Sequence, residues 1–299
     1  MVGLGFFILV SLVGNRSKPT TFYSLRSSLW DDCESNFKKT HHIMEKELLM
    51  NEVAAIARDA GEAIMEIYQK DFDIEFKEDE SPVTTADIKS HKVICAGLEK
   101  LALDLPLLSE ESAATPWDGR KQWKCYWLID PLDGTKEFIK KNGEFTVNIA
   151  LIENGVATLG VVYAPALKTT YMAAEGVGSF KEHEGKQSRL TLQRKPVKGL
   201  IRVVGSRSHS SPEFEDYIKR FETVEIVSKG SSLKFCLVAE GAADIYPRLG
   251  LTSEWDTGAG QAVAEIAGAR VTQIDGSPLQ YNTKEALLNP FFVVSALQD

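Results

Sequence analysis

Six consecutive residues, 130–135, combine side chains that bind cations with a backbone that can bind an anion. Asp130 and Asp133 flank a rigid Pro-Leu step, and both are carboxylates, which Mg2+ and related hard cations prefer. Gly134 and Thr135 follow at once. Glycine lets an anion approach the backbone closely, and N–H groups at a helix start attract negative charge. Cations beside an anion site are what the hydrolysis of a phosphate ester requires.

Two further acidic segments stand at the ends of predicted elements. Glu110 and Glu111 follow an apolar stretch, and Asp256 stands near the start of a predicted helix. Carboxylates at such ends can converge on one cleft. Because these ligands are oxygens with no His or Cys nearby, they favour Mg2+, Mn2+ or Ca2+ over zinc. In a two-metal site the ions lie about 3.5–4 Å apart, and Asp130 is the natural candidate to bridge them. The carbonyl of Leu132 is a further candidate ligand, because a turn that contains proline directs it toward the site.

Each of these features alone is more often structural than functional. An Asp-Gly step is usually a turn, an Asp at a helix start is usually an N-cap, and a Glu-Glu pair is usually a solvated face. Their occurrence together, in this order and in apolar surroundings, favours one shared site.

Several polar residues in the second half of the chain are candidates for contacts with a second phosphate or a ribose. They are Ser206, Arg207, Lys234 and Arg248. Arginine is suited to bidentate phosphate contacts, and the alternative for each is a solvated surface residue. His209 could contact an adenine base, although a histidine in a polar loop more often has no functional role.

The elements that must position these residues follow from periodicity. Residues 44–70 carry apolar side chains at helical spacing, including Leu48, and a second helix over 81–102 has Thr85 or Asp87 as its cap. Apolar strands end at the acidic segments, and a turn at 153–155 predicts a β-hairpin. The first half is therefore predicted as helices against an antiparallel or mixed sheet.

The second half alternates strands and helices, which is typical of an α/β arrangement. The predicted fold class is α/β, with an α+β half over 44–184 and an α/β half over 185–299. Residues 1–43 are predicted as an extension. Its apolar run, 3–14, is shorter than the roughly 20 residues that a membrane-spanning helix needs. An upstream start before Met44, a peripheral membrane contact and a targeting peptide are its three interpretations.

Charge and cysteine usage narrow the function classes. The net charge of −8 argues against a nucleic-acid partner, which would require an excess of Lys and Arg. A small phosphorylated substrate remains compatible, because a bound cation reverses the local sign. The four cysteines form no CxxC pair, which favours a reducing, cytoplasmic setting. A peripheral position on the cytoplasmic face of the inner membrane is the alternative localisation.

These motifs resemble those of the inositol monophosphatase superfamily of metal-dependent, lithium-sensitive phosphatases. WLIDPLDGTKEF at 127–138 is similar to its first motif, and EWDTGAGQAVAEIAGA at 254–269 is similar to its second. LLSEES at 107–112 resembles the upstream acidic segment, and SPVTTAD at 81–87 the threonine–aspartate loop. The resemblance covers residues 47–285, and four motifs in the same order make it specific.

Within that superfamily the chain is most similar to CysQ-type 3'(2'),5'-bisphosphate nucleotidases. The residues after DGT and the segments VVGSRSH, GSSLKFCLVAEGAADIYPR and TSEWDTGAGQAV carry this likeness. Such enzymes convert adenosine 3',5'-bisphosphate, a product of sulfate activation, to AMP and phosphate. The resemblance implies a layered α-β-α-β-α sugar-phosphatase-like architecture, two or three Mg2+ ions and a small nucleotide substrate. One departure is LGLTSEWD, where a Pro is expected beside the Thr-Ser step; no ligand is affected.

Carried over residue by residue, the resemblance implies a metal site and a substrate site. The implied Mg2+ ligands are Glu110, Asp130, Asp133, Asp256 and the Leu132 carbonyl. The residues expected to contact the substrate are Glu110, Leu132, Asp133, Gly134, Thr135, Ser206, Arg207, Lys234, Arg248 and Asp256.

The implied catalytic residues are Glu110, Thr135 and Asp87. Glu110 and Thr135 would orient and deprotonate the attacking water. Asp87, with Thr84 or Thr85 beside it, would support a further metal or the Thr135 hydroxyl. The N–H groups of the DGT turn would grip the scissile phosphate, and water activated by Mg2+ would attack in line without a phospho-enzyme. Two alternatives remain: hydrolysis of inositol or other sugar monophosphates on the same fold, and a non-catalytic sensor of metal or nucleotide.

Overall fold

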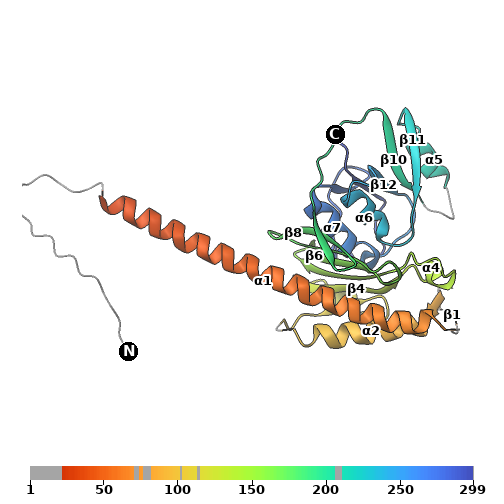
Figure 1. Cartoon of the computed structure of the whole chain (residues 1–299), viewed down its shortest axis with the longest axis horizontal. Coiled ribbons are helices and arrows are strands. Elements are labelled where there is room, and N and C mark those ends of the chain that lie inside the picture. The colour runs from red at the N-terminus through yellow and green to blue at the C-terminus, as the bar shows by residue number, and fades with distance from the viewer. Residues whose placement is uncertain are drawn as a thin grey trace, which may run out of the picture. The chain divides into compact units, whose positions relative to one another are not determined.

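Two large β-sheets, of seven and five strands, organise the structure (Figure 1), and a third sheet pairs β1 (Ile74–Phe76) with β2 (Pro82–Thr84). The computed structural model describes residues 22–70, 74–76, 82–101, 103–112, 115–205 and 211–298. Contacts divide the chain into two units, residues 1–43 and Met44–Asp299, and both large sheets belong to the second unit. The division of that unit into halves at 184/185 stays a prediction.

The helices and strands have the following bounds. The helices are α1 (Phe22–Tyr68), α2 (Thr85–Leu98), α3 (Trp117–Arg120), α4 (Thr135–Ile139), α5 (Pro212–Ile218), α6 (Leu233–Ala239) and α7 (Gly258–Ala267), with 3-10 turns η1 (Pro165–Leu167) and η2 (Glu254–Asp256). The strands are β1 (Ile74–Phe76), β2 (Pro82–Thr84), β3 (Leu107–Ser109), β4 (Cys125–Asp133), β5 (Thr146–Glu153), β6 (Val156–Ala164), β7 (Thr169–Ala174), β8 (Gly178–His183), β9 (Lys186–Leu190), β10 (Leu200–Gly205), β11 (Thr223–Ser228), β12 (Ile245–Arg248), β13 (Arg270–Gln273) and β14 (Phe292–Ser295).

The seven-stranded sheet has the order β3-β4-β5-β6-β7-β8-β9. β3 runs parallel to β4, and every other neighbouring pair is antiparallel. The sheet is therefore mixed, as the sequence predicts. The hairpin at 153–155 is confirmed, and its turn uses positive φ angles at Asn154 (52°) and Gly155 (81°), which suit these two residue types.

The five-stranded sheet has the order β11-β10-β12-β14-β13. β10 is parallel to both β11 and β12, while β14 is antiparallel to its two neighbours. α6 and α7 lie between the two sheets, α2 and the Met44–Tyr68 part of α1 lie against the large sheet, and α5 lies on the outer face of the small one (Figure 1). This five-layer α-β-α-β-α arrangement confirms the predicted fold class.

Local details correct two sequence predictions. Thr84 caps α2, because its hydroxyl accepts from the Ala86 N–H. In return, the Asp87 carboxylate accepts from the Thr84 N–H. The predicted caps, Thr85 and Asp87, lie one and three residues inside that boundary. Leu48, predicted on the apolar stripe of the first helix, is 61% exposed, whereas Val53, Ile56, Ala60 and Ile64 of that stripe are buried.

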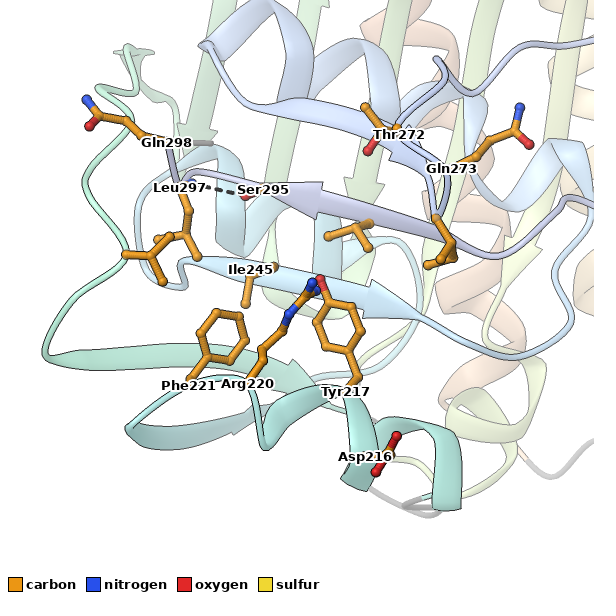
Figure 2. Close-up of a pocket in the computed structure, with 14 residues that line it drawn as sticks. Asp216, Tyr217, Arg220, Phe221, Ile245, Thr272, Gln273, Ser295, Leu297 and Gln298 are labelled. Carbon is orange, nitrogen blue, oxygen red and sulfur yellow. Dashed lines mark hydrogen bonds between the residues drawn. The ribbon is translucent and has the colours of Figure 1, made fainter.

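The outer face of the small sheet is only partly covered by α5. Beside that helix a hollow of about 620 Å³ remains, into which Tyr217, Arg220 and Phe221 reach over Ile245 of β12 (Figure 2). The Arg220 guanidinium stacks on the Tyr217 ring, 4.3 Å from its centroid. Of the carboxylates only Asp216 lines this hollow, so the predicted acidic cluster lies elsewhere.

The residues predicted for membrane contact, 3–14, lie outside the described residues. Within the part of the chain that the structure describes, no helix has both the length and the hydrophobicity of a membrane span.

Gly160 of β6 provides a test of how closely the large sheet packs on α7. A Cβ at this position would lie 2.4 Å from the Ala259 carbonyl oxygen and 2.8 Å from the Ala262 Cβ. We expect Gly160→Ala to destabilise the fold by about 1–3 kcal/mol, as overpacking does in well-packed cores. Thermal unfolding followed by circular dichroism measures this. Gly119→Ala is the control, because its nearest neighbour is a Thr115 methyl at 3.4 Å; equal losses in both variants would contradict the prediction.

Candidate metal centre

A β-bulge in β4 brings two of the predicted carboxylates to the same pocket. Asp130 pairs with Asn148 of β5, whereas Asp133 pairs with Thr146, so β4 contains one extra residue over this step. Residues three apart on a regular strand point to opposite faces. The extra residue returns Asp133 to the face of Asp130. Both side chains line a pocket of about 590 Å³.

Two other chain segments bring further carboxylates to this pocket. β3 is parallel to β4, and the Glu110 N–H donates to the Ile129 carbonyl at 3.2 Å. Asp256 ends η2, where its Oδ2 accepts from the Ser253 N–H at 2.8 Å. Carboxylate oxygens of Glu110, Asp130 and Asp256 lie within 4.8 Å of one another. The structure therefore brings together three acidic residues that the sequence separates by 20 and 126 positions.

Asp133 lines the same pocket and is tied to the second half of the chain. Its Oδ2 accepts from the Ser232 N–H at 2.6 Å and lies 2.7 Å from the Ser232 Oγ. That hydroxyl also lies 2.8 Å from the Asp256 carbonyl oxygen and accepts from the Asn148 amide at 2.8 Å. Ser232 thus links two of the predicted metal ligands. Glu111, the neighbour of Glu110, does not line the pocket.

Leu132 and Thr135 sit beside the carboxylates. Leu132 lines the pocket and donates its N–H to Asp130 Oδ1 at 3.1 Å. The Thr135 hydroxyl lies 3.3 Å from Asp87 Oδ1 and 3.4 Å from the Leu132 carbonyl oxygen. Asp87 is buried, and its Oδ2 accepts from the Thr84 N–H at 2.8 Å and the Thr84 hydroxyl at 2.6 Å. Of the two roles expected for Asp87, this placement favours support of the Thr135 hydroxyl.

The turn at Gly134 requires glycine for two reasons. Its φ is +88°, which L side chains rarely adopt, and a Cβ would lie 3.2 Å from Ser231 Cβ and 3.3 Å from the Glu144 carbonyl oxygen. α4 begins at Thr135, directly after this turn, but has only five residues. Anion binding here would therefore depend on individual N–H groups rather than on a long helix dipole.

Burial and like charge both oppose ionisation of the carboxylates in this pocket. Burial raises the pKa of Asp130 well above its usual value, and Glu110 and Asp133 raise it further. Burial also raises the pKa of Asp256 to about 8, with Asp133 as the strongest neighbouring charge. Both shifts arise because several carboxylates face one another out of water. A divalent cation would relieve this repulsion, and a set of oxygen donors alone suits Mg2+. The residues present therefore fit the expected metal.

A smaller recess of about 80 Å³ adjoins the carboxylate pocket. Lys234, Arg248 and Ser231 line it together with Asp133 and Asp256. Burial lowers the pKa of Lys234 to about 8, although Asp133 acts in the opposite direction. Of the four residues predicted to contact a second phosphate or a ribose, the structure thus brings two, Lys234 and Arg248, beside the acidic cluster.

The remaining two substrate candidates, Ser206 and Arg207, lie outside the described residues, as does His209. The sequence reasoning also missed two residues that line the main pocket, Lys229 and Ser231. The short KGSS turn directly before a predicted helix was the available signal, since such turns expose N–H and hydroxyl donors.

Comparisons with known proteins agree with this geometry. The model of the inositol monophosphatase family matches residues 45–296. The 3'(2'),5'-bisphosphate nucleotidase CysQ of Escherichia coli is 52% identical over 251 residues, which cover 83% of this chain and 99% of that protein. The crystal structure of CysQ from Bacteroides thetaiotaomicron is 45% identical, with a TM-score of 0.73 over 83% of this chain and 97% of that one. An IMPase/NADP phosphatase complexed with Mg2+ and phosphate shares the fold at 19% identity, with a TM-score of 0.67 over 85% and 92%.

Metal binding should be visible as a gain in stability. A ligand at 100 times its Kd stabilises a protein by about 2.7 kcal/mol, so we expect added Mg2+ to raise the Tm. Asp130→Asn should abolish most of this rise, because it removes the most buried carboxylate of the cluster. Asp118→Asn is the control, since Asp118 is exposed and pairs only with Lys121 in the described contacts. Equal Mg2+ responses in both variants would contradict the site.

Proposed function

The chain belongs to the inositol monophosphatase family, and from that premise we propose that it is a metal-dependent 3'(2'),5'-bisphosphate nucleotidase. It removes the 3'-phosphate of adenosine 3',5'-bisphosphate to give AMP and phosphate. One observation carries this choice of substrate. The carboxylate pocket and the cation-lined recess are contiguous and share Asp133, Asp256 and Lys234 in their linings. A substrate with two phosphates can place one beside the carboxylates and the other beside the cations.

Five groups would hold Mg2+ in this pocket. They are the carboxylates of Glu110, Asp130, Asp133 and Asp256 and the carbonyl of Leu132. Bound there, Mg2+ lowers the pKa of a coordinated water and neutralises charge on the phosphate. Mg2+ usually keeps several waters and takes only one or two carboxylates, so this donor set is sufficient for two or three ions. The carboxylates alone would repel a phosphate, so substrate binding depends on the cation.

In this proposal Thr135 orients the attacking water and Glu110 accepts its proton. The Thr135 hydroxyl donates its proton to Asp87, which leaves its lone pairs available to accept from a water in the pocket. Asp87 is itself fixed by two bonds from Thr84, so this acceptor keeps its place beside the Thr135 hydroxyl. Glu110 accepts the proton that the water loses. Because β3 pairs with β4, Glu110 is held beside Asp130 for that task.

The N–H groups of Gly134 and Thr135 bind the scissile phosphate in this proposal. The left-handed turn at Gly134 exposes its backbone to the pocket, and both residues line it. Donors fixed in advance stabilise charge that develops on phosphate oxygens without further reorganisation.

The recess binds the second phosphate. The Ser231 hydroxyl and the Arg248 Nε are buried and have no hydrogen-bond partner among the described residues. Buried polar groups normally have partners, and phosphate oxygens would accept from both. Lys234 adds a cation at the same place. Ser206 and Arg207 remain proposed contacts.

A comparison of substrates tests the assignment. We expect adenosine 3',5'-bisphosphate to be hydrolysed with a kcat/KM about 10–100 times that of inositol 1-phosphate, since charge-assisted bonds to the second phosphate contribute roughly 1.5–3 kcal/mol each. Phosphate release in Mg2+, with and without Li+, is the measurement, and Li+ should inhibit. Faster turnover of the inositol ester would refute the choice of substrate.

The matched control for that assay is Asp133→Asn, which should retain the fold and lose activity by orders of magnitude. If the unmodified protein is equally inactive with Mg2+, the chain is a sensor of metal or nucleotide rather than an enzyme.

The recess is tested separately by Lys234→Gln. This change removes the buried cation, so it should reduce kcat/KM for adenosine 3',5'-bisphosphate by about 10-fold or more. Its effect on adenosine 3'-phosphate, which lacks the second phosphate, should be smaller. Equal losses on the two substrates would place the second phosphate elsewhere.

A further inference from the structure

The catalytic pocket is closed on one side by a short segment of the second half, residues 229–232. Lys229, Gly230 and Ser231 line this pocket together with Gly134 and Thr135. Ser231 has a φ of +47°, a conformation that L side chains rarely adopt, so it persists only where neighbours hold it. The segment therefore requires an anchor on the elements around the pocket.

Ser232 supplies one such anchor through its bonds to Asp133. The other lies at Glu144, just before β5. Glu144 is buried, with 6% of its surface exposed. Its Oε2 accepts from the Gly230 N–H at 2.8 Å, and its Oε1 lies 3.3 Å from the Lys229 ammonium. A buried carboxylate bonded to a backbone N–H is a strong, directional contact.

The packing at Gly230 shows that this contact is tight. A Cβ on Gly230 would lie 2.8 Å from the Glu144 carbonyl oxygen and 3.0 Å from the Glu144 Cβ. Any larger residue would push the segment away from Glu144. Ser231 follows immediately, and Lys234 lies three residues further on, in the first turn of α6. The anchor at Gly230 therefore controls where the groups of the recess stand relative to the DGT turn.

We propose that Glu144 is a positioning residue that sets the spacing between the two phosphate sites. Its bond to the Gly230 N–H holds residues 229–232 against the start of β5, so that Ser231 and Lys234 meet the second phosphate while the DGT turn holds the first. This role rests on the proposed bisphosphate substrate. Glu144 does not touch the reacting atoms, and its effect appears as selectivity for two phosphates over one.

The experiment compares kcat/KM for adenosine 3',5'-bisphosphate and adenosine 3'-phosphate in each variant with Mg2+. The ratio of the two values is unaffected by a loss of folded protein, which lowers both equally. Glu144→Ala should lower the ratio by about tenfold, and Gly230→Ala should lower it similarly by displacing the segment. Glu144→Gln should retain most of the ratio, because its amide oxygen can accept from the Gly230 N–H.

Glu240→Ala is the matched control. Glu240 is a partly buried glutamate that bonds Tyr171 at 3.0 Å and Lys181 at 2.6 Å, away from the pocket. Its loss should leave the ratio within twofold of the unmodified protein's.

The outcomes separate two failures. If the unmodified protein does not prefer the bisphosphate, the proposed substrate fails whatever the variants do. If it does, and Glu144→Ala and Gly230→Ala keep the ratio of the Glu240→Ala control, the positioning role is overturned. A Glu144→Gln ratio as low as that of Glu144→Ala would overturn the assignment to the Gly230 bond. Should Glu144→Ala fail to fold, Gly230→Ala decides the question.

Discussion

Mutual repulsion among buried carboxylates is the constraint on which the rest of this structure depends. Glu110, Asp130 and Asp256 hold oxygens within 4.8 Å of one another, and Asp133 lines the same pocket. Without a cation such an arrangement opposes folding, because each charge is removed from water and faces others of the same sign. The rest of the fold must therefore be stable enough to hold it. The cores on both sides of α6 and α7 supply that stability, since most of their apolar side chains are fully buried.

The same repulsion bears on how the site would select a doubly phosphorylated substrate. The carboxylates of the pocket would repel a phosphate until cations bind them, so in the proposed function the metal binds before the substrate. The recess beside the pocket adds two cations, Lys234 and Arg248, to the carboxylates of Asp133 and Asp256. The two regions share Asp133, Asp256 and Lys234 in their linings and meet where Ser232, at the start of α6, contacts Asp133. In the proposed function, recognition of a doubly phosphorylated substrate depends on this contact, and small shifts there would alter selectivity more than the chemical step.

Most short-range features followed from the sequence because neighbouring residues specify them. The hairpin at 153–155, for example, depends on the few adjacent residues that form its turn. The errors have a different cause in each case. Thr84, rather than Thr85 or Asp87, caps α2, because its hydroxyl accepts from the Ala86 N–H and is bonded to the buried Asp87. Leu48 fits a helical stripe by spacing, but the buried face of α1 runs through Met50 and Val53 and leaves Leu48 exposed.

The sequence alone determined the chemical identity of the site: oxygen donors, a glycine turn and the order in which they occur, from which the family, the fold class and a phosphate substrate could be inferred. It could not determine the bulge that places Asp130 and Asp133 on one face. A bulge in β4 exists only relative to the register of the neighbouring strand, β5. Nor could the sequence show that Ser232 and Glu144 join the halves, since those contacts span 99 and 86 residues of chain. Contacts at such separations are set by how the two sheets pack, and only the tertiary structure decides that.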